Sequence, residues 1–170
     1  MRPNPRRNTA SPDARAAAAQ AKAVAPRALS QAIAVGRAPT RDEVAVLANA
    51  GFRSLVNNRP DGEKDSPMTS AETEAAASSV GLAYAHIPVE GRIPLEKDVR
   101  AFVEALEALP QPVYAFCHSG GRSAALWALA SVTDMTTEAL IETCAEAGHD
   151  ISGLAAKIDM RREMLEDTDE

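Results

Sequence analysis

A strand-to-helix segment in the second half of the chain reads Val113-Tyr114-Ala115-Phe116-Cys117-His118-Ser119-Gly120-Gly121-Arg122-Ser123. The continuous apolar run over residues 113–116 is typical of a strand that helices cover on both faces. The polar, glycine-containing loop that follows it lies at the carboxyl end of that strand, which is where ligands bind in open parallel sheets. The segment therefore predicts a central strand, a binding loop and a helix that begins near Arg122.

Strand and helix signals alternate along the rest of the chain. Further strands are expected over residues 31–35, 54–57 and 82–89, and helices over residues 40–50, 69–80, 95–109, 123–132, 137–147 and 151–165. Thr40 and Thr69 are each followed three residues later by a glutamate, which is the capping-box pattern of a helix start. The order β-α-β-α-β-α-β-α predicts a three-layer α/β fold, with a mainly parallel sheet of about four to five strands and helices on both faces.

Length and composition narrow the class of protein. The chain has 170 residues, the size of one ordinary domain, and 45% hydrophobic with 25% charged residues, which is globular composition. Aromatic residues are only 4%, too few for a base-stacking nucleic-acid surface. No apolar run approaches the roughly 18 residues that cross a bilayer. We expect a soluble protein with one site and with neither nucleic acid nor membrane as partner; oligomeric state is not predicted.

Charge is unevenly distributed. Residues 1–28 contain six cations and one acid, whereas the remainder contains 12 cations and 23 acids. An acidic domain is a poor match for a polyanion that needs many phosphate contacts, but a small anion in a local positive pocket is compatible with it. We expect residues 1–28 to form a disordered basic tail and residues 29–170 to form the catalytic domain.

The predicted location is the cytoplasm. The two cysteines are too few for a disulfide framework or a zinc site, and no apolar signal segment precedes them. We therefore expect no metal and no cofactor. The alternative is an organelle, because an Arg-rich, acid-poor start resembles a transit peptide, although Pro3, Pro5 and Pro12 interrupt an amphipathic helix there. Cys144 shares a helix face with apolar residues and is expected to be a buried apolar side chain.

The loop after Cys117 is suited to binding an anion. Its amides, over residues 118–122, can converge on one point, and the following helix adds the positive end of its dipole. Gly120 and Gly121 permit the tight curvature, and Arg122 can hold two oxygens of one tetrahedral anion. The same field lowers the pKa of Cys117 and makes it a nucleophile. We expect Ser123 to donate a hydrogen bond to the sulfur.

Two motifs together resemble a known family. The segment from Cys117 to Ser123, continued by Leu126-Trp127-Ala128-Leu129, is one motif; Gly51-Phe52 with Asn57-Asn58-Arg59-Pro60-Asp61-Gly62-Glu63 is the other. Over residues 29–155 the chain resembles the bacterial beta-lactamase-hydrolase-like phosphatase family. The resemblance implies a fold similar to the dual-specificity protein tyrosine phosphatases, and an activity that is either phosphatase or sulfurtransferase.

Loop length separates those two activities. Tyrosine-specific phosphatases place five residues between cysteine and arginine, whereas here there are four, His118 to Gly121. The shorter loop loses one N–H donor and up to ~3.5 Å of contour, and it resembles the rhodanese sulfurtransferases. His118 stands where the family resemblance leads us to expect a more basic residue. We therefore favour sulfur transfer through a persulfide on Cys117, with thiosulfate or a persulfide as the small anionic substrate.

Two alternatives stay open. The first is a phosphatase that acts on a phosphate ester through a phosphocysteine, for which Glu90 is the candidate general acid; a solvated surface glutamate is the competing interpretation. The second is a catalytically silent module that binds an anion or a phosphorylated partner. Arg59 and Asp61 follow another strand, so they either border the pocket or stabilise a turn.

The remaining two histidines are expected to be structural. His86 shares a strand face with apolar residues and is predicted to be packed and hydrogen-bonded. His149 follows Gly148, which ends a predicted helix, and is assigned to the turn.

Overall fold

A five-stranded sheet with the order β1-β2-β5-β3-β4 forms the middle layer of the protein. In the computed structural model, which describes residues 13–168, the strands are β1 (Arg27–Ala28), β2 (Ile33–Arg37), β3 (Ser54–Asn57), β4 (Ala83–His86) and β5 (Val113–Cys117). Strands β2 to β5 run parallel, and β1 is antiparallel to β2. The predicted α/β fold with a mainly parallel sheet is confirmed.

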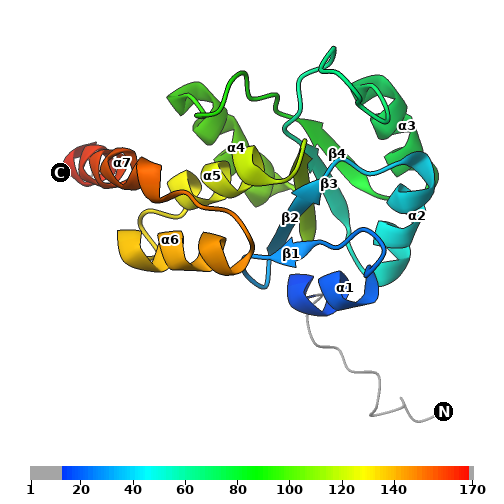
Figure 1. Ribbon diagram of the computed structural model, residues 1–170, viewed down its shortest axis with the longest axis horizontal. Helices are drawn as coiled ribbons and strands as arrows, with labels where there is room; N and C mark the ends of the chain where they lie inside the picture. Colours follow the sequence, from blue (N-terminus) through cyan, green and yellow to red (C-terminus); the bar gives the residue numbers. More distant parts are fainter. Residues whose placement is uncertain (1–12, 169–170) are drawn as a thin grey trace, which may run out of the picture.

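Helices cover both faces of this sheet (Figure 1). One face carries α1 (Ala14–Gln20), α2 (Arg41–Ala50) and α3 (Ser70–Ser79). The other carries α4 (Glu96–Ala108) and α5 (Gly121–Ala130), with α6 (Thr137–Glu146), the short 3-10 helix η1 (Ser152–Leu154) and α7 (Ala155–Thr168) packed beyond α5. The three-layer arrangement is therefore the one that the alternating pattern predicts.

Strand β5 is at the centre of the sheet and is buried along its whole length. Val113 and Ala115 pack into the α4–α5 side, whereas Tyr114 and Phe116 pack into the α1–α3 side. Burying a side chain of the size of Val or Phe stabilises the fold by about 1.5–3 kcal/mol. The continuous apolar run thus fixes β5 between two layers and leaves Cys117 at the carboxyl edge of the sheet.

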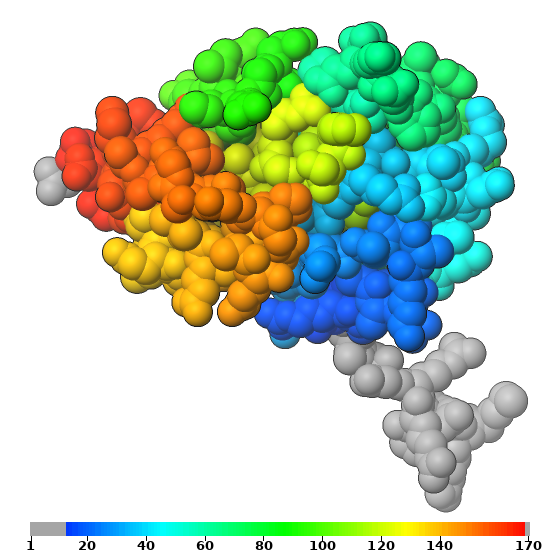
Figure 2. All heavy atoms as spheres, viewed as in Figure 1, coloured from blue at the N-terminus to red at the C-terminus, as the bar shows by residue number. Residues whose placement is uncertain are grey.

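The first described residues belong to the folded unit. Asp13 caps α1, and Ala14 and Ala17 are buried in the core cluster on that side of the sheet. Figure 2 shows α1 and β1, in blue, packed against the rest of the molecule. The predicted tail is therefore wrong for residues 13–28, because small alanine side chains let a short helix pack closely without a broad apolar face. Residues 1–12 of that prediction lie outside the described residues.

Element ends differ slightly from those expected. Both predicted capping boxes are present, at Thr40 and at Thr69. Strand β2 continues to Arg37, and β4 stops at His86, after which Val89 donates its amide to the carbonyl of Asn58 at 3.0 Å. The segment after β4 is thereby held over the carboxyl end of β3.

Among residues 13–168 no helix has both the length and the apolar character that a membrane crossing requires.

Candidate active site

The loop between β5 and α5 curls around the sulfur of Cys117. The amide of Gly120 donates to Sγ at 3.1 Å. Gly120 has a left-handed backbone with φ of 112°, and a β-carbon there would lie 3.1 Å from the backbone of Gly36 on β2. Glycine alone fits both constraints, because it has no side chain and adopts positive φ without strain. The tight curvature predicted for this glycine is present.

Cys117 is only 2% exposed, yet it lines an open pocket of about 850 Å³. Burial acts to raise the pKa of its thiol, but the amides of Ser123, Gly120 and Arg122 and the charge of Arg122 outweigh it, so the pKa lies below the ordinary value. His118 and Ser119 are exposed and line the same pocket. The site is therefore a cysteine with a lowered pKa at the base of a pocket, with the backbone donors of its own loop around the sulfur.

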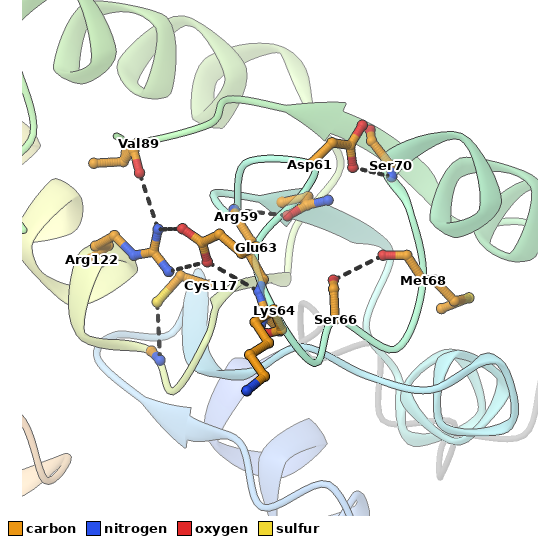
Figure 3. A network of polar contacts seen from close by, with 12 residues as sticks. Arg59, Asp61, Glu63, Lys64, Ser66, Met68, Ser70, Val89, Cys117 and Arg122 are labelled. Atoms are coloured by element: carbon orange, nitrogen blue, oxygen red, sulfur yellow. Dashed lines mark hydrogen bonds and ion pairs between the residues drawn. The ribbon is translucent and has the colours of Figure 1, made fainter. Parts of the chain in front are cut away.

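Arg122 stands beside this sulfur, held by two partners (Figure 3). Its Nη1 and Nη2 donate to the two carboxylate oxygens of Glu63 at 2.7 and 2.9 Å. Nη1 also donates to the carbonyl of Val89 at 3.1 Å. The guanidinium is thereby fixed from the segments after β3 and after β4, and Glu63 and Val89 orient it relative to Cys117.

The next question is which N–H groups of the Arg122 guanidinium are available to bind an anion. A guanidinium has five N–H groups in one plane. Among the described residues, Glu63 and Val89 accept from three of them, and the two that stay unused, on Nε and Nη2, share one edge. Two oxygens of a tetrahedral anion fit such an edge. Arg122 can therefore keep its protein partners and bind an anion at the same time.

Glu63 is a residue of the candidate site that the sequence interpretation missed. Its Oε1 also accepts from Nε of Arg59 at 3.1 Å. The hydrogen bond from Arg122 lowers the pKa of Glu63, with burial opposing it and Arg59 adding to it. The carboxylate stays ionised, so Glu63 is a positioning residue and a poor proton donor. It lies in the motif at residues 57–63, but nothing local in that motif points toward Arg122.

Ser123 acts differently from the prediction. Its hydroxyl donates to Oδ1 of Asn58 at 2.7 Å, and Asn58 in turn donates to the carbonyl of Ile87 at 3.0 Å. The side chain therefore ties α5 to the end of β3, and only the backbone amide of Ser123 serves the sulfur. The predicted hydroxyl donation to Cys117 is absent from this arrangement because Asn58, which is fully buried, needs that donor.

Glu90 lies away from the pocket. It is exposed, whereas Arg92 and Ile93 of the same segment line the pocket. Val89 is buried, with its amide bonded to Asn58 and its carbonyl to Arg122. This fixed backbone leaves the next side chain in solvent. The structure thus places Glu90 where the surface-glutamate interpretation expects it.

Arg59 and Asp61 do not line this pocket. Arg59 is buried and reaches the site indirectly, through Glu63. Asp61 accepts from the amide of Ser70 at 2.8 Å, so its side chain holds the loop after β3 to the start of α3. His86 is hydrogen-bonded to the carbonyl of Arg59 at 2.9 Å, as predicted. Within residues 13–168 no cluster of three or more potential metal ligands is found.

Fold and site together define a cysteine-based, phosphatase-like α/β protein. The chain belongs to the family described as beta-lactamase hydrolase-like protein, phosphatase-like domain, whose model matches residues 25–134. The family resemblance of the sequence is thereby confirmed. Beta-lactamase hydrolase-like proteins of Xylella fastidiosa and Agrobacterium fabrum are 37% and 31% identical over 106 residues, which is 62% of this chain. The match spans 25% of the length of these relatives.

Solved structures share the fold. A candidate phosphatase from Neisseria meningitidis is 24% identical, with 80% of this chain and 97% of that chain covered and a TM-score of 0.71. PTPMT1 in complex with PI(5)P is 18% identical, with 84% and 98% covered and a TM-score of 0.66. These neighbours have the fold of the protein tyrosine phosphatases, as expected. They lend no support to the predicted sulfur transfer.

Proposed function

We propose that the protein is a phosphatase that hydrolyses a small phosphate ester through a phosphocysteine on Cys117. The observation that carries this proposal is the Nε and Nη2 edge of Arg122, which its hydrogen bonds to the described residues leave unused, beside a sulfur whose pKa is lowered. A phosphoryl group placed over Cys117 would put two oxygens on that edge and the third toward the loop amides. Membership of a phosphatase-like family and the fold of the structural neighbours support the same activity.

The first half of the reaction follows from this placement. Sγ of Cys117 attacks phosphorus, a P–S bond forms, and the bond to the leaving oxygen breaks with its electron pair. Negative charge that develops on the phosphoryl oxygens is held by Arg122 and by the loop amides, which are already oriented and need no rearrangement. Glu63 keeps its charge throughout and holds the guanidinium in position.

Sulfur transfer is the second candidate function. The four-residue spacing between Cys117 and Arg122 favours it, because the shorter loop resembles that of rhodaneses. Transfer of a sulfane sulfur also needs no general acid, because the group that leaves, sulfite or a thiolate, is a good leaving group without a proton. The preference drawn from the sequence is nevertheless reversed, since family and neighbours are phosphatase-like.

The test is a paired assay on the full chain. Incubation with p-nitrophenyl phosphate should release p-nitrophenol and leave a phosphoryl adduct on Cys117 in quenched samples analysed by intact mass. Incubation with thiosulfate should leave the mass unchanged. Cys117→Ser should abolish release, and Cys144→Ser is the matched control that retains it. A persulfide without p-nitrophenol release would favour the second candidate, and neither product would favour the silent binding module.

A further inference from the structure

A histidine from outside the cysteine loop lies against that loop. His149 belongs to the segment between α6 and η1, shown in orange in Figure 2, and lines the same pocket as Cys117. A β-carbon on Gly120 would lie 2.9 Å from its Nε2, and one on Gly121 would lie 3.9 Å from its Nδ1. The imidazole therefore runs along the two glycines, and the turn assignment made from the sequence describes its backbone but omits its side chain.

The ring of His149 is available for proton transfer. No hydrogen bond to either ring nitrogen is found within residues 13–168, and the side chain is half-buried. Burial, and after it the charge of Arg27, lower the pKa of His149 below its usual value. Near neutral pH the imidazole is uncharged, so one nitrogen carries a lone pair that can accept a proton.

The other titratable side chains of the pocket are less suited to this role. Glu63 uses its oxygens to hold Arg122 and Arg59. Asp150 is exposed and accepts from the amide of Ser152 at 2.9 Å, and its hydrogen bonds to Ser152 lower its pKa. The ordinary pKa of a carboxyl group is about 4, so a carboxylate whose pKa is lowered further accepts a proton poorly near neutral pH, whereas an imidazole starts from about 6.5. His118 is exposed on the loop itself.

We propose that His149 is the general base for hydrolysis of the phosphocysteine, an inference that rests on the proposed phosphatase activity. The oxygen of a water molecule attacks phosphorus, the P–S bond breaks, and its electron pair returns to Sγ. The water gives one proton to the imidazole, which later releases it to solvent. The products are inorganic phosphate and the Cys117 thiolate, and no oxidant or further reactant is needed.

The experiment separates the two halves of the reaction. Wild-type protein and His149→Asn are mixed rapidly with p-nitrophenyl phosphate. Loss of the base slows only the second half, so kcat should fall by roughly 100-fold while kcat/KM, which ends at the first irreversible bond cleavage, stays near that of wild type. The variant should release a burst of one p-nitrophenol per active site and accumulate a phosphoryl adduct on Cys117. Glu142→Gln, an exposed change on α6, is the matched control and should behave as wild type.

Three outcomes would overturn the assignment. The first is an equal fall of kcat and kcat/KM in His149→Asn, with no adduct. The second is a burst in His118→Gln or Asp150→Asn that His149→Asn lacks. The third is absence of p-nitrophenol release by wild-type protein, which overturns the phosphatase as well and so is distinguishable from the other two. Thermal melting checks folding, and His149→Phe, which keeps a ring over the glycines, is the second variant.

Discussion

The two cysteines of this protein are equally buried and chemically opposite. Cys117 is 2% exposed and Cys144 is 0% exposed. Burial raises the pKa of the Cys144 thiol to about 12, and the one hydrogen bond found for this thiol among residues 13–168 is donated to the carbonyl of Ala124, at 3.8 Å. Burial acts on Cys117 in the same direction, yet the pKa of Cys117 is lowered.

The hydrogen-bond donors around each sulfur account for the opposite pKa shifts of the two thiols. Cys144 lies in the last turn of α6, where the amides already donate within the helix, whereas Cys117 ends a strand and precedes a helix start with free amides. Three of those amides and Arg122 favour the thiolate. Cysteine reactivity in this fold is thus determined by the position of the residue on its element, and the two sites together form an internal control.

The largest effect expected from this comparison is on activity. Cys117→Ser should lower kcat/KM for p-nitrophenyl phosphate by at least about a thousandfold, because a hydroxyl is not ionised there and is a weak nucleophile. Cys144→Ser should retain activity and lose only stability, by about 1–2 kcal/mol, because a hydroxyl replaces a thiol in an apolar core. Steady-state assays measure the activity of both variants, and thermal melting measures their stability. Comparable activity losses in both variants would mean that Cys117 is not the nucleophile.

A smaller loss is expected for Arg122→Lys. A lysine keeps the charge but lacks the planar edge formed by Nε and Nη2, and it cannot serve Glu63 and two anion oxygens together. We expect kcat/KM to fall by about 10²- to 10³-fold, the range found when one preorganised donor is lost. The thiol pKa of Cys117 should rise, with that of Cys144 unchanged. Full activity in the lysine variant would show that charge alone suffices.

Glu63→Gln tests positioning, and its effect should be smaller again. The amide loses two charge-assisted bonds to Arg122 and turns an NH₂ group toward a donor. The guanidinium becomes mobile, and we expect kcat/KM to fall by about tenfold, in line with one such interaction at roughly 1.4 kcal/mol. Glu90→Gln is the matched control, since that side chain is exposed. Equal losses in both variants would contradict the positions assigned to these two glutamates.

Local sequence was sufficient for the elements that form the cysteine site. The apolar run of β5, the glycines of the loop and the helix start after them lie within eleven residues, so the nucleophile, the cradle and the cation are predictable together. The capping boxes fixed the helix starts of α2 and α3 in the same way. The tail predicted from composition was wrong for residues 13–28, because an alanine-rich helix packs through close contacts that no apolar periodicity reveals.

The residues that the sequence did not identify act across long separations. Glu63 reaches Arg122 from 59 residues away, and His149 reaches Gly120 from a segment beyond α6. Register and loop path determine such contacts, and neither is encoded by a local pattern. Glu90 illustrates the opposite error. Its place on the expected loop suggested a role as general acid, but the backbone of the buried Val89 is held by two hydrogen bonds and leaves the Glu90 side chain in solvent.

The smallest predicted effect is the pH at which Cys117 reacts. Burial is the largest single influence on its thiol, and the amides and Arg122 exceed it only in combination, so the net lowering of the pKa is a difference between opposing contributions. Iodoacetamide alkylation followed by mass spectrometry should therefore give a midpoint for Cys117 below that of a free thiol. Alkylation should increase as pH rises through that midpoint, because the thiolate is the reacting form.

Cys144 should stay unmodified over the same pH range while the protein is folded, and the Cys117→Ser variant should take up no label. Competition with an anion gives a second test of the difference between the two cysteines. Inorganic phosphate bound on the free edge of Arg122 would cover Sγ and place negative charge beside it, so added phosphate should slow alkylation of Cys117. A midpoint at or above that of a free thiol, or a rate that phosphate leaves unchanged, would mean that the converging donors do not overcome burial or that the anion binds elsewhere.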